Sequence, residues 1–210
     1  MIRKMPWTKV LGTVKDFICM LRRNKIMRDW EKFYKNNFNL NADFSKIYIP
    51  RCPNIGWRLL IILQGIGPEL AFRKSQKILG SVTKFYDASL DDVIVENERD
   101  SKNGSYAIWV RNGKEADRIH KNKSANQVKA EKLLTETCLE RLIHGLKYFR
   151  ETGKHLDVKT ATFCSGSWDS DGRVPCVCQI YSFDQDSILV TWHRRDSDDS
   201  NVRAREVVSC

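Results

Sequence analysis

The side chains best suited to chemistry in this 210-residue chain are its four histidines and seven cysteines. No two histidines are spaced as metal ligands on one predicted element, and His144 is expected at the boundary of the core. Cys176 and Cys178 form a C-x-C pair near Cys164, which lacks the two to four intervening residues of common zinc sites. We therefore expect no metal and no cofactor. The odd number of cysteines and their irregular spacing favour a reducing compartment, the cytoplasm, over a secreted disulfide scaffold.

Paired carboxylates are the second group that could do chemistry. Asp91 with Asp92 and Glu115 with Asp117 both lie among polar residues, as on a solvated surface. Acid–base catalysis needs a shielded pocket that separates two pKa values. The chain also contains no glycine-rich phosphate loop, nucleophile elbow or H-E-x-x-H sequence. These features predict a protein that is not an enzyme.

Residues 164–203 use a restricted set of amino acids: seven Asp, seven Ser, four Arg and three Cys, with no Lys, Glu or Met. Randomising the adenines of asparagine codons gives access to Asp, Ser, Arg, Cys, His, Tyr, Gly and Asn, and excludes Lys, Glu, Gln, Met and Trp. Gln179 and Gln185 must then be positions fixed by the template. The composition therefore fits adenine-specific mutagenesis. A set of ordinary turns rich in Asp and Ser is the alternative, because these residues favour turns. Turn preference does not explain Arg194, Arg195, or cysteines on predicted strands.

In this composition the chain resembles the variable proteins of diversity-generating retroelements. Cys164-Ser165-Gly166-Ser167-Trp168 is similar to the glycine-serine-tryptophan motif that opens the variable region of C-type-lectin-fold members. The segment 202–208 is similar to their last core strand, with Arg203-Ala204-Arg205 in place of the usual glycine-phenylalanine-arginine. The resemblance implies a C-type lectin-like fold and a binding protein whose exposed residues are rewritten over a constant core.

The ligand implied by this resemblance is unknown and is expected to be a protein. On the predicted strands, Val177 should point inward, and Cys176 and Cys178 should point outward together, because successive side chains alternate between the faces of a strand. Aromatic and arginine side chains among small polar groups suit an adaptable binding surface. The expected ligand contacts are Trp168, Asp169, Asp171, Arg173, Cys176, Cys178, Tyr181, Thr191, His193, Arg194, Arg195, Asp196, Asp198 and Asn201.

The elements that must position these residues follow from hydrophobic periodicity. Ser124 and Gln127 form a capping box, and apolar residues from Ala130 onward recur at i+4, which predicts one helix of about seven turns ending at Gly153. Strands are expected over 57–63, 106–110, 158–164, 174–180, 188–192 and 202–208. The fold class is therefore α+β, with a long amphipathic helix packed on a small twisted, mostly antiparallel sheet.

The amino-terminal part is expected to be a basic helical extension, residues 1–42, preceding an α+β domain over 43–210. One helix is predicted around Val10, Val14 and Phe17, and a second around Trp30 and Phe33. Residues 1–35 hold ten basic and three acidic groups. A packed extension with a solvated charged face explains them, and binding to phosphate is the alternative.

The net charge of +10 hides an uneven distribution. The chain has no lysine after Lys159, so residues 160–210 carry a net charge of −3 and the rest carry +13. A nucleic-acid-binding protein that uses this basic amino-terminal two-thirds is therefore the alternative function. No membrane span is expected, because the longest purely apolar run, 59–63, is far shorter than the roughly 20 residues that a spanning helix needs.

Overall fold

The computed structural model describes residues 24–85, 87–181 and 186–209, and the chain divides into two units, Met1–Lys46 and Ile47–Cys210. In the first unit, a helix over 24–38 buries Trp30, Phe33, Tyr34 and Phe38. These residues recur at helical spacing and form a stripe. The ring of Tyr34 lies 5.4 Å from Phe38 and 5.9 Å from Phe44, which follows the helix. The helix predicted around Trp30 is confirmed, and the one around Val10 lies outside the described residues.

The second unit contains a three-stranded antiparallel sheet with the order β1-β4-β10. Its strands are β1, Trp57–Ile62, β4, Tyr106–Arg111, and β10, Val207–Val208. Leu60 pairs with Ile108, and both are fully buried. The strands expected over 57–63 and 106–110 are thus confirmed. The apolar run in β1 is continuous because the sheet has no solvated face at this position.

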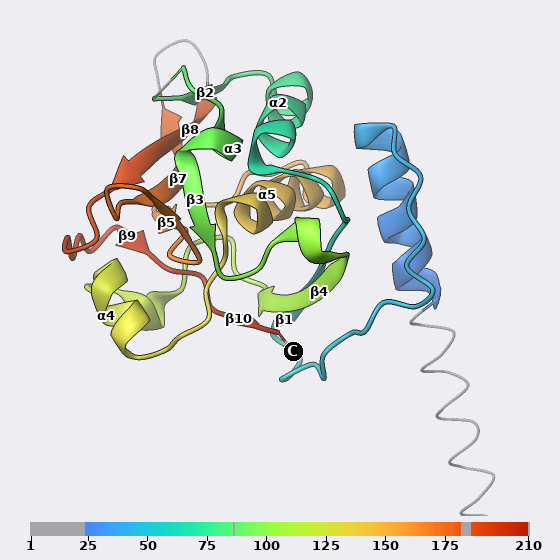
Figure 1. The fold of residues 1–210 in the computed structure, drawn as a ribbon, viewed down its shortest axis with the longest axis horizontal. Coiled ribbons are helices and arrows are strands. Elements are labelled where there is room, and N and C mark those ends of the chain that lie inside the picture. Colours follow the sequence, from blue (N-terminus) through green and yellow to red (C-terminus); the bar gives the residue numbers. More distant parts are fainter. Residues whose placement is uncertain (1–23, 86, 182–185, 210) are drawn as a thin grey trace, which may run out of the picture. The chain divides into compact units, whose positions relative to one another are not determined.

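A five-stranded mixed sheet has the order β2-β8-β7-β5-β9 (Figure 1). Its strands are β2, Val82–Lys84, β5, Ala161–Phe163, β7, Val174–Tyr181, β8, Asp186–His193, and β9, Val202–Arg203. β7 runs antiparallel to β8 and to β5, whereas β2 is parallel to β8 and β9 is parallel to β5. A further antiparallel pair joins β3, Ile94–Asn97, to β6, Ser167–Asp169.

The single long helix predicted from Ser124 to Gly153 is wrong. The chain forms α4, Ala125–Ala130, and α5, Cys138–Thr152, each opened by its own capping box. Between them Lys132 takes a left-handed conformation with φ 55°, and Thr135 forms a bridge with Glu206. The second capping box, Thr137 with Glu140, satisfies the free amides that begin α5, so a new helix starts there. The capping box at Ser124 and the stop at Gly153 are confirmed.

The remaining elements were not predicted by periodicity. They are α2, Pro68–Leu79, α3, Leu90–Val93, and the 3-10 turns η1, Ser101–Asn103, and η2, Arg118–His120. α5 packs against α2, β1 and β7, so it lies between the two larger sheets. No helix within the described ranges is long and apolar enough to cross a membrane.

The strand predicted over 202–208 is interrupted, because the three residues between β9 and β10 bond to other segments. Ala204 O accepts from Asp117 N at 3.2 Å, and Arg205 O accepts from Glu136 N at 3.0 Å. The side chain of Arg205 is fully buried. The architecture is therefore a mixed α+β fold with several small sheets.

Candidate functional site

An open hollow of about 250 Å³ lies on the carboxy-terminal segment. It is lined by Asp171, Gly172, Arg173, Arg194, Arg195 and Asp196. These residues come from the turn between β6 and β7 and from the segment that follows β8. Five of the six were expected from the sequence to contact a ligand. β7 and β8 pair along their whole length, and the pair Val174 with His193 brings their two ends together beside the hollow.

The turn on one side of the hollow is organised by Asp169. One oxygen of its carboxylate accepts from Asp171 N at 3.0 Å and from Arg173 N at 2.7 Å, and the other accepts from Arg173 Nε at 2.7 Å. Gly172 N donates to Asp169 O at 3.1 Å, which closes the turn. Gly172 has φ 72°, a left-handed conformation that favours glycine. Asp169 is therefore a structural residue of the turn.

The three arginines of the hollow differ in how their charges are compensated. Arg173 pairs with Asp169 and also lies 2.9 Å from Asp171, and Arg194 lies 3.1 Å from Asp196. The hydrogen bond from Arg194 holds the pKa of Asp196 below its usual value, and the charge of Arg195 contributes to this. The Arg195 guanidinium forms no hydrogen bond or ion pair with any residue in the described part of the chain. The hollow therefore contains one exposed guanidinium, that of Arg195, without an ion-pair partner among the described residues.

The structure separates the expected contacts by their burial. Asp171, Arg194, Arg195, Asp196, Asp198 and Asn201 are exposed, whereas Arg173, Cys178, Thr191 and His193 are partly buried. Trp168, Asp169 and Cys176 are buried. Tyr181 belongs to β7, and its side chain lies outside the described set. Of the residues expected to contact a ligand, only those near the ends of β7 and β8 lie around the hollow.

The expectation that Cys176 points outward is wrong. Cys176 is opposite Phe163 in the sheet, and opposite residues of an antiparallel pair share a face. On that face, Phe163 and Val174 belong to a buried cluster with Trp168, Ala204 and two residues of α4, Ala125 and Val128. The cluster covers the face of β7 that carries Cys176, and Val177 on the opposite face is buried as well. Alternation along β7 therefore does not separate a buried side from an exposed one. Burial also raises the pKa of Cys176, so its thiol stays protonated.

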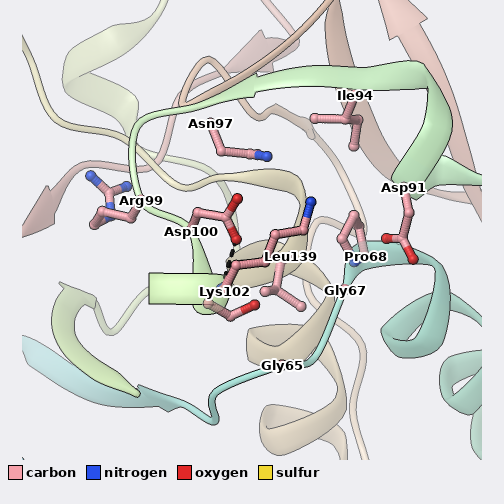
Figure 2. A pocket seen from close by; sticks show the side chains of 11 residues that line it. Gly65, Gly67, Pro68, Asp91, Ile94, Asn97, Arg99, Asp100, Lys102 and Leu139 are labelled. Carbon is pink, nitrogen blue, oxygen red and sulfur yellow. Dashed lines mark hydrogen bonds between the residues drawn. The ribbon is translucent and has the colours of Figure 1, made fainter. Parts of the chain in front are cut away.

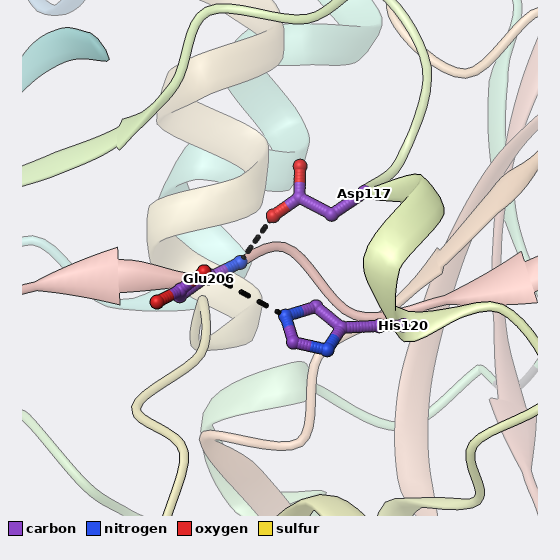
Figure 3. A group of neighbouring side chains, drawn as sticks. All are labelled: Asp117, His120 and Glu206. Atoms are coloured by element: carbon purple, nitrogen blue, oxygen red, sulfur yellow. Dashed lines mark hydrogen bonds and ion pairs between the residues drawn. The ribbon is translucent and has the colours of Figure 1, made fainter. Parts of the chain in front are cut away.

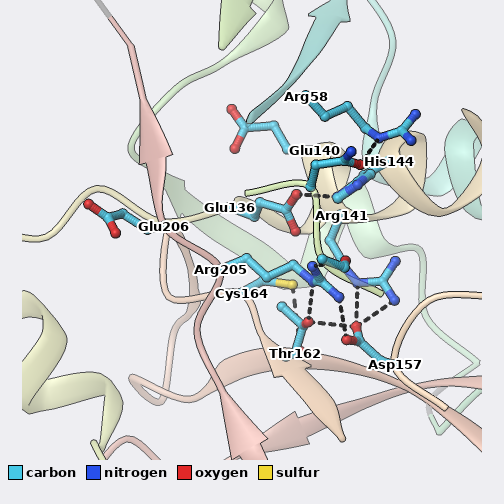
Figure 4. A network of polar contacts seen from close by, with 12 residues as sticks. Arg58, Glu136, Glu140, Arg141, His144, Asp157, Thr162, Cys164, Arg205 and Glu206 are labelled. Carbon is cyan, nitrogen blue, oxygen red and sulfur yellow. Dashed lines mark hydrogen bonds and ion pairs between the residues drawn. The ribbon is translucent and has the colours of Figure 1, made fainter. Parts of the chain in front are cut away.

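A network of buried charges in the interior was not expected from the sequence (Figure 4). Asp157 accepts from Arg141 Nη2 at 2.7 Å, from Thr162 Oγ1 at 2.6 Å and from Arg205 Nη2 at 2.6 Å. Burial alone would raise the pKa of Asp157, but the charges of Arg205 and Arg141 lower it below its usual value. The Asp157 carboxylate is therefore ionised, and its negative charge is compensated by the two guanidinium groups.

The same network includes a pair formed by Glu136 and His144. His144 Nδ1 lies 2.7 Å from Glu136 Oε1, and both side chains are fully buried. Burial raises the pKa of Glu136 to about 8 and, with help from the charges of Arg205 and Arg141, lowers that of His144 well below its usual value. Both groups are therefore neutral near pH 7. His144 is not at the boundary of the core, as was expected, but inside it.

One sequence signal could have revealed this interior network. The ionisable residues Glu140, Arg141, His144 and Lys147 of α5 recur at the same helical spacing as its apolar residues, and all four are buried. Charged residues that repeat on the buried stripe of a helix indicate partners on a neighbouring element. Arg141 pairs with Asp157 and Glu140 pairs with Arg99, and neither partner lies on α5, so the sequence could not identify them.

A smaller cavity of about 160 Å³ lies beside the start of α2, between Gly67, Asp91 and Lys102 (Figure 2). A helix amino terminus favours anions. Here Asp91 Oδ1 already accepts from Glu69 N at 3.1 Å, and a side chain at Gly67 would come within 2.4 Å of that carboxylate. Asp91 therefore takes the place of an anion at this terminus.

The hollow thus combines exposure, a guanidinium without an ion-pair partner among the described residues, and most of the exposed residues that the sequence predicted. Comparison with protein-family models, with curated proteins and with solved structures finds no match to this chain.

Proposed function

We propose that this chain is a ligand-binding protein without enzymatic activity, and that its ligand docks at the hollow between Asp171 and Asp196. One observation supports this most directly: every residue that lines the hollow falls in the compositionally restricted segment 164–203. Loops and turns held by a rigid sheet are where binding residues concentrate. Here β7 and β8 form that support. Val177 of β7 is paired with Val190 of β8, and both side chains are buried.

The ligand that suits this hollow is a protein with an acidic side chain at the contact. Arg173 and Arg194 already have aspartate partners, whereas Arg195 has none among the described residues. A carboxylate of the partner would be held by the planar guanidinium of Arg195 through charge-assisted hydrogen bonds, which are stronger than neutral ones.

Binding of an acidic peptide tests this proposal. Poly-glutamate is titrated into the full chain and into the Arg195→Ala variant by calorimetry. We expect the variant to bind about tenfold or more weakly, because a lost charge-assisted hydrogen bond is worth roughly 1.5–3 kcal/mol. Arg51→Ala, which removes an exposed arginine elsewhere, is the matched control. Equal binding by wild type and Arg195→Ala would reject the hollow as the docking site.

We also propose that this surface is diversified by adenine-specific mutagenesis on a C-type lectin-like fold. The support is the absence of lysine after Lys159 and the exposure of Asp171, Arg194 and Asp198, whose residue types are accessible from asparagine codons. Buried Trp168, Asp169 and Cys176 then belong to the constant frame. The gene should lie beside a reverse transcriptase and a near-copy of the 164–203 coding segment that differs at adenines. A neighbourhood without both would exclude the proposal.

The location that fits these proposals is the cytoplasm. Five cysteines are described, Cys52, Cys138, Cys164, Cys176 and Cys178, and each has a free thiol. A reducing compartment keeps thiols in this form.

Nucleic-acid binding by the amino-terminal unit is a second candidate function. The helix over 24–38 exposes Lys25, Arg28 and Lys32, which line a shallow hollow of about 390 Å³ with Asn24 and Asp29. This candidate predicts that duplex DNA binds with an affinity that falls steeply with salt. The triple variant Lys25→Glu, Arg28→Glu, Lys32→Glu should lose that binding, whereas Arg195→Ala should keep it. DNA binding that is unaffected by the triple variant would exclude this helix.

A further inference from the structure

Three potential metal ligands from two distant segments meet beside β4. Asp117 precedes η2, His120 ends it, and Glu206 lies between β9 and β10 (Figure 3). One ligand atom from each side chain lies within 4.8 Å of the other two, and His120 Nε2 is 3.9 Å from Glu206 Oε2. The group shares no residue with the hollow and is independent of the ligand-binding function proposed for it.

His120 is the unusual member of this group. Its side chain is 3 % exposed, and neither Nδ1 nor Nε2 has a hydrogen-bond partner among the described residues. A buried polar group without a partner is costly, and in a native protein such an exception indicates a missing water or ion.

We propose that Asp117, His120 and Glu206 bind a divalent metal ion of the zinc type. One imidazole nitrogen and two carboxylate oxygens are ligands that zinc accepts, at about 2.0–2.2 Å. Tetrahedral geometry at those distances places ligand atoms roughly 3.4 Å apart, so the side chains need to close by about an ångström. Three protein ligands leave a fourth position for water. Glu206, whose side chain is 25 % exposed, provides access from solvent.

Hydrogen bonds donated by backbone N–H groups hold the two segments together. Glu206 N donates to Asp117 Oδ2 at 2.7 Å, and Asp117 N donates to Ala204 O at 3.2 Å. His120 N donates to Asp117 O at 3.0 Å, within the 3-10 turn. The segments that carry the three ligands are therefore joined by hydrogen bonds within the protein, one of which orients the Asp117 carboxylate.

Arg111 completes the surroundings of the group. Its Nη2 lies 2.7 Å from Glu206 Oε2, and its Nε lies 3.6 Å from Asp117 Oδ2. The guanidinium also lies over the ring of Trp57 at 4.9 Å, which restrains it. Glu206 Oε2, the oxygen that Arg111 contacts, is also the oxygen that lies 3.9 Å from His120 Nε2. The hydrogen bond from Arg111 orients this carboxylate, as outer-sphere partners do in metal sites. Two carboxylates and one guanidinium leave a net charge of −1 to meet the cation.

Zinc titration of the full chain tests the site. The protein is stripped with a chelator, kept reduced, and titrated with Zn²⁺ by calorimetry. We expect one ion per chain, with binding weakened by roughly tenfold or more in Asp117→Asn and Glu206→Gln, and lost in His120→Ala. His155→Ala, which removes a partly exposed histidine outside the group, should bind as the wild type does.

Two further measurements separate this site from a folding defect and from zinc bound by cysteines. Asp117→Asn keeps an oxygen that can accept from Glu206 N, so this variant carries the test if His120→Ala does not fold. Substitution with Co²⁺ should give a visible spectrum without the charge-transfer band of a thiolate ligand, because the proposed ligands are nitrogen and oxygen. The proposal is overturned if wild type does not bind Zn²⁺, if Asp117→Asn and Glu206→Gln bind it unchanged, or if the Co²⁺ spectrum shows thiolate ligation.

Discussion

Asp169 and Asp171 lie two positions apart in one turn, and their carboxylates have different surroundings. Asp169 is buried and accepts two backbone hydrogen bonds and one from Arg173, whereas Asp171 is exposed and pairs only at the surface. We expect Asp169→Ala to lower the free energy of unfolding by about 1.5–3 kcal/mol, the value of a hydrogen bond to a charged group. Asp171→Ala should change it by less than about 0.5 kcal/mol. Urea denaturation measures both, and equal effects would contradict the structural role of Asp169.

Glu136 predicts a pH dependence of stability. Its pKa is about 8 in the folded chain, against a usual value of 4.5, so folding favours the protonated form. Stability from this group is complete below pH 4.5 and is lost as pH rises towards 8, by up to roughly 1.4 kcal/mol per unit of pKa difference. His144 has a lowered pKa and reduces stability only below its usual value of 6.5.

The pH range from 6.5 to 8 therefore isolates Glu136 from His144. Between these values, wild type should lose stability relative to Glu136→Gln, which has the same shape and does not ionise. Thermal melts of both proteins in matched buffers measure the difference. Parallel curves across this range would mean that Glu136 titrates normally in the folded chain.

At the scale of the elements, the break between α4 and α5 depends on local hydrogen bonds at the second capping box. Thr137 Oγ1 accepts from Glu140 N at 3.2 Å, and Glu140 Oε2 accepts from Thr137 N at 2.8 Å. Thr137→Ala should therefore lower the free energy of unfolding by about 1 kcal/mol. Thr152→Ala removes an exposed hydroxyl at the other end of α5 and should have an effect of only a few tenths. Equal effects in denaturation experiments would show that the cap does not stabilise the start of α5.

At the scale of the whole Ile47–Cys210 unit, the buried charges around Asp157 join segments that are distant in the sequence. Arg141 is on α5, Thr162 is on β5, and Arg205 also donates to the carbonyl oxygens of Gly113 and Lys114. Asp157→Asn leaves two buried guanidinium groups without their anion and should cost about 3–5 kcal/mol. Asp196→Asn, which breaks the exposed pair with Arg194, should cost less than about 1 kcal/mol. Calorimetric melting compares them, and similar losses would mean that the interior network adds no stability.

Much of the secondary structure was determined by the sequence itself, because its signals are local. Continuous apolar runs predicted β1 and β4, and alternating residues predicted β7 and β8. Ser124 with Gln127 marked the start of α4, because both partners of a capping box lie within one turn. The helical spacing of apolar residues predicted a helix that continues past the end of α4. It does so because the spacing persists through the segment around Thr135, which the tertiary structure holds in a bridge to Glu206.

Tertiary structure alone decided which side chains the solvent reaches and which charges meet. The alternation along β7 correctly separated Val177 from Cys176, but only the cluster over Phe163 shows that both faces are covered. Likewise Asp157 with Arg205, and His120 with Glu206, are brought together from positions far apart in the chain. Periodicity reports the direction of a side chain relative to its neighbours in sequence. What covers that side chain, and what compensates its charge, depends on segments whose approach no local pattern records.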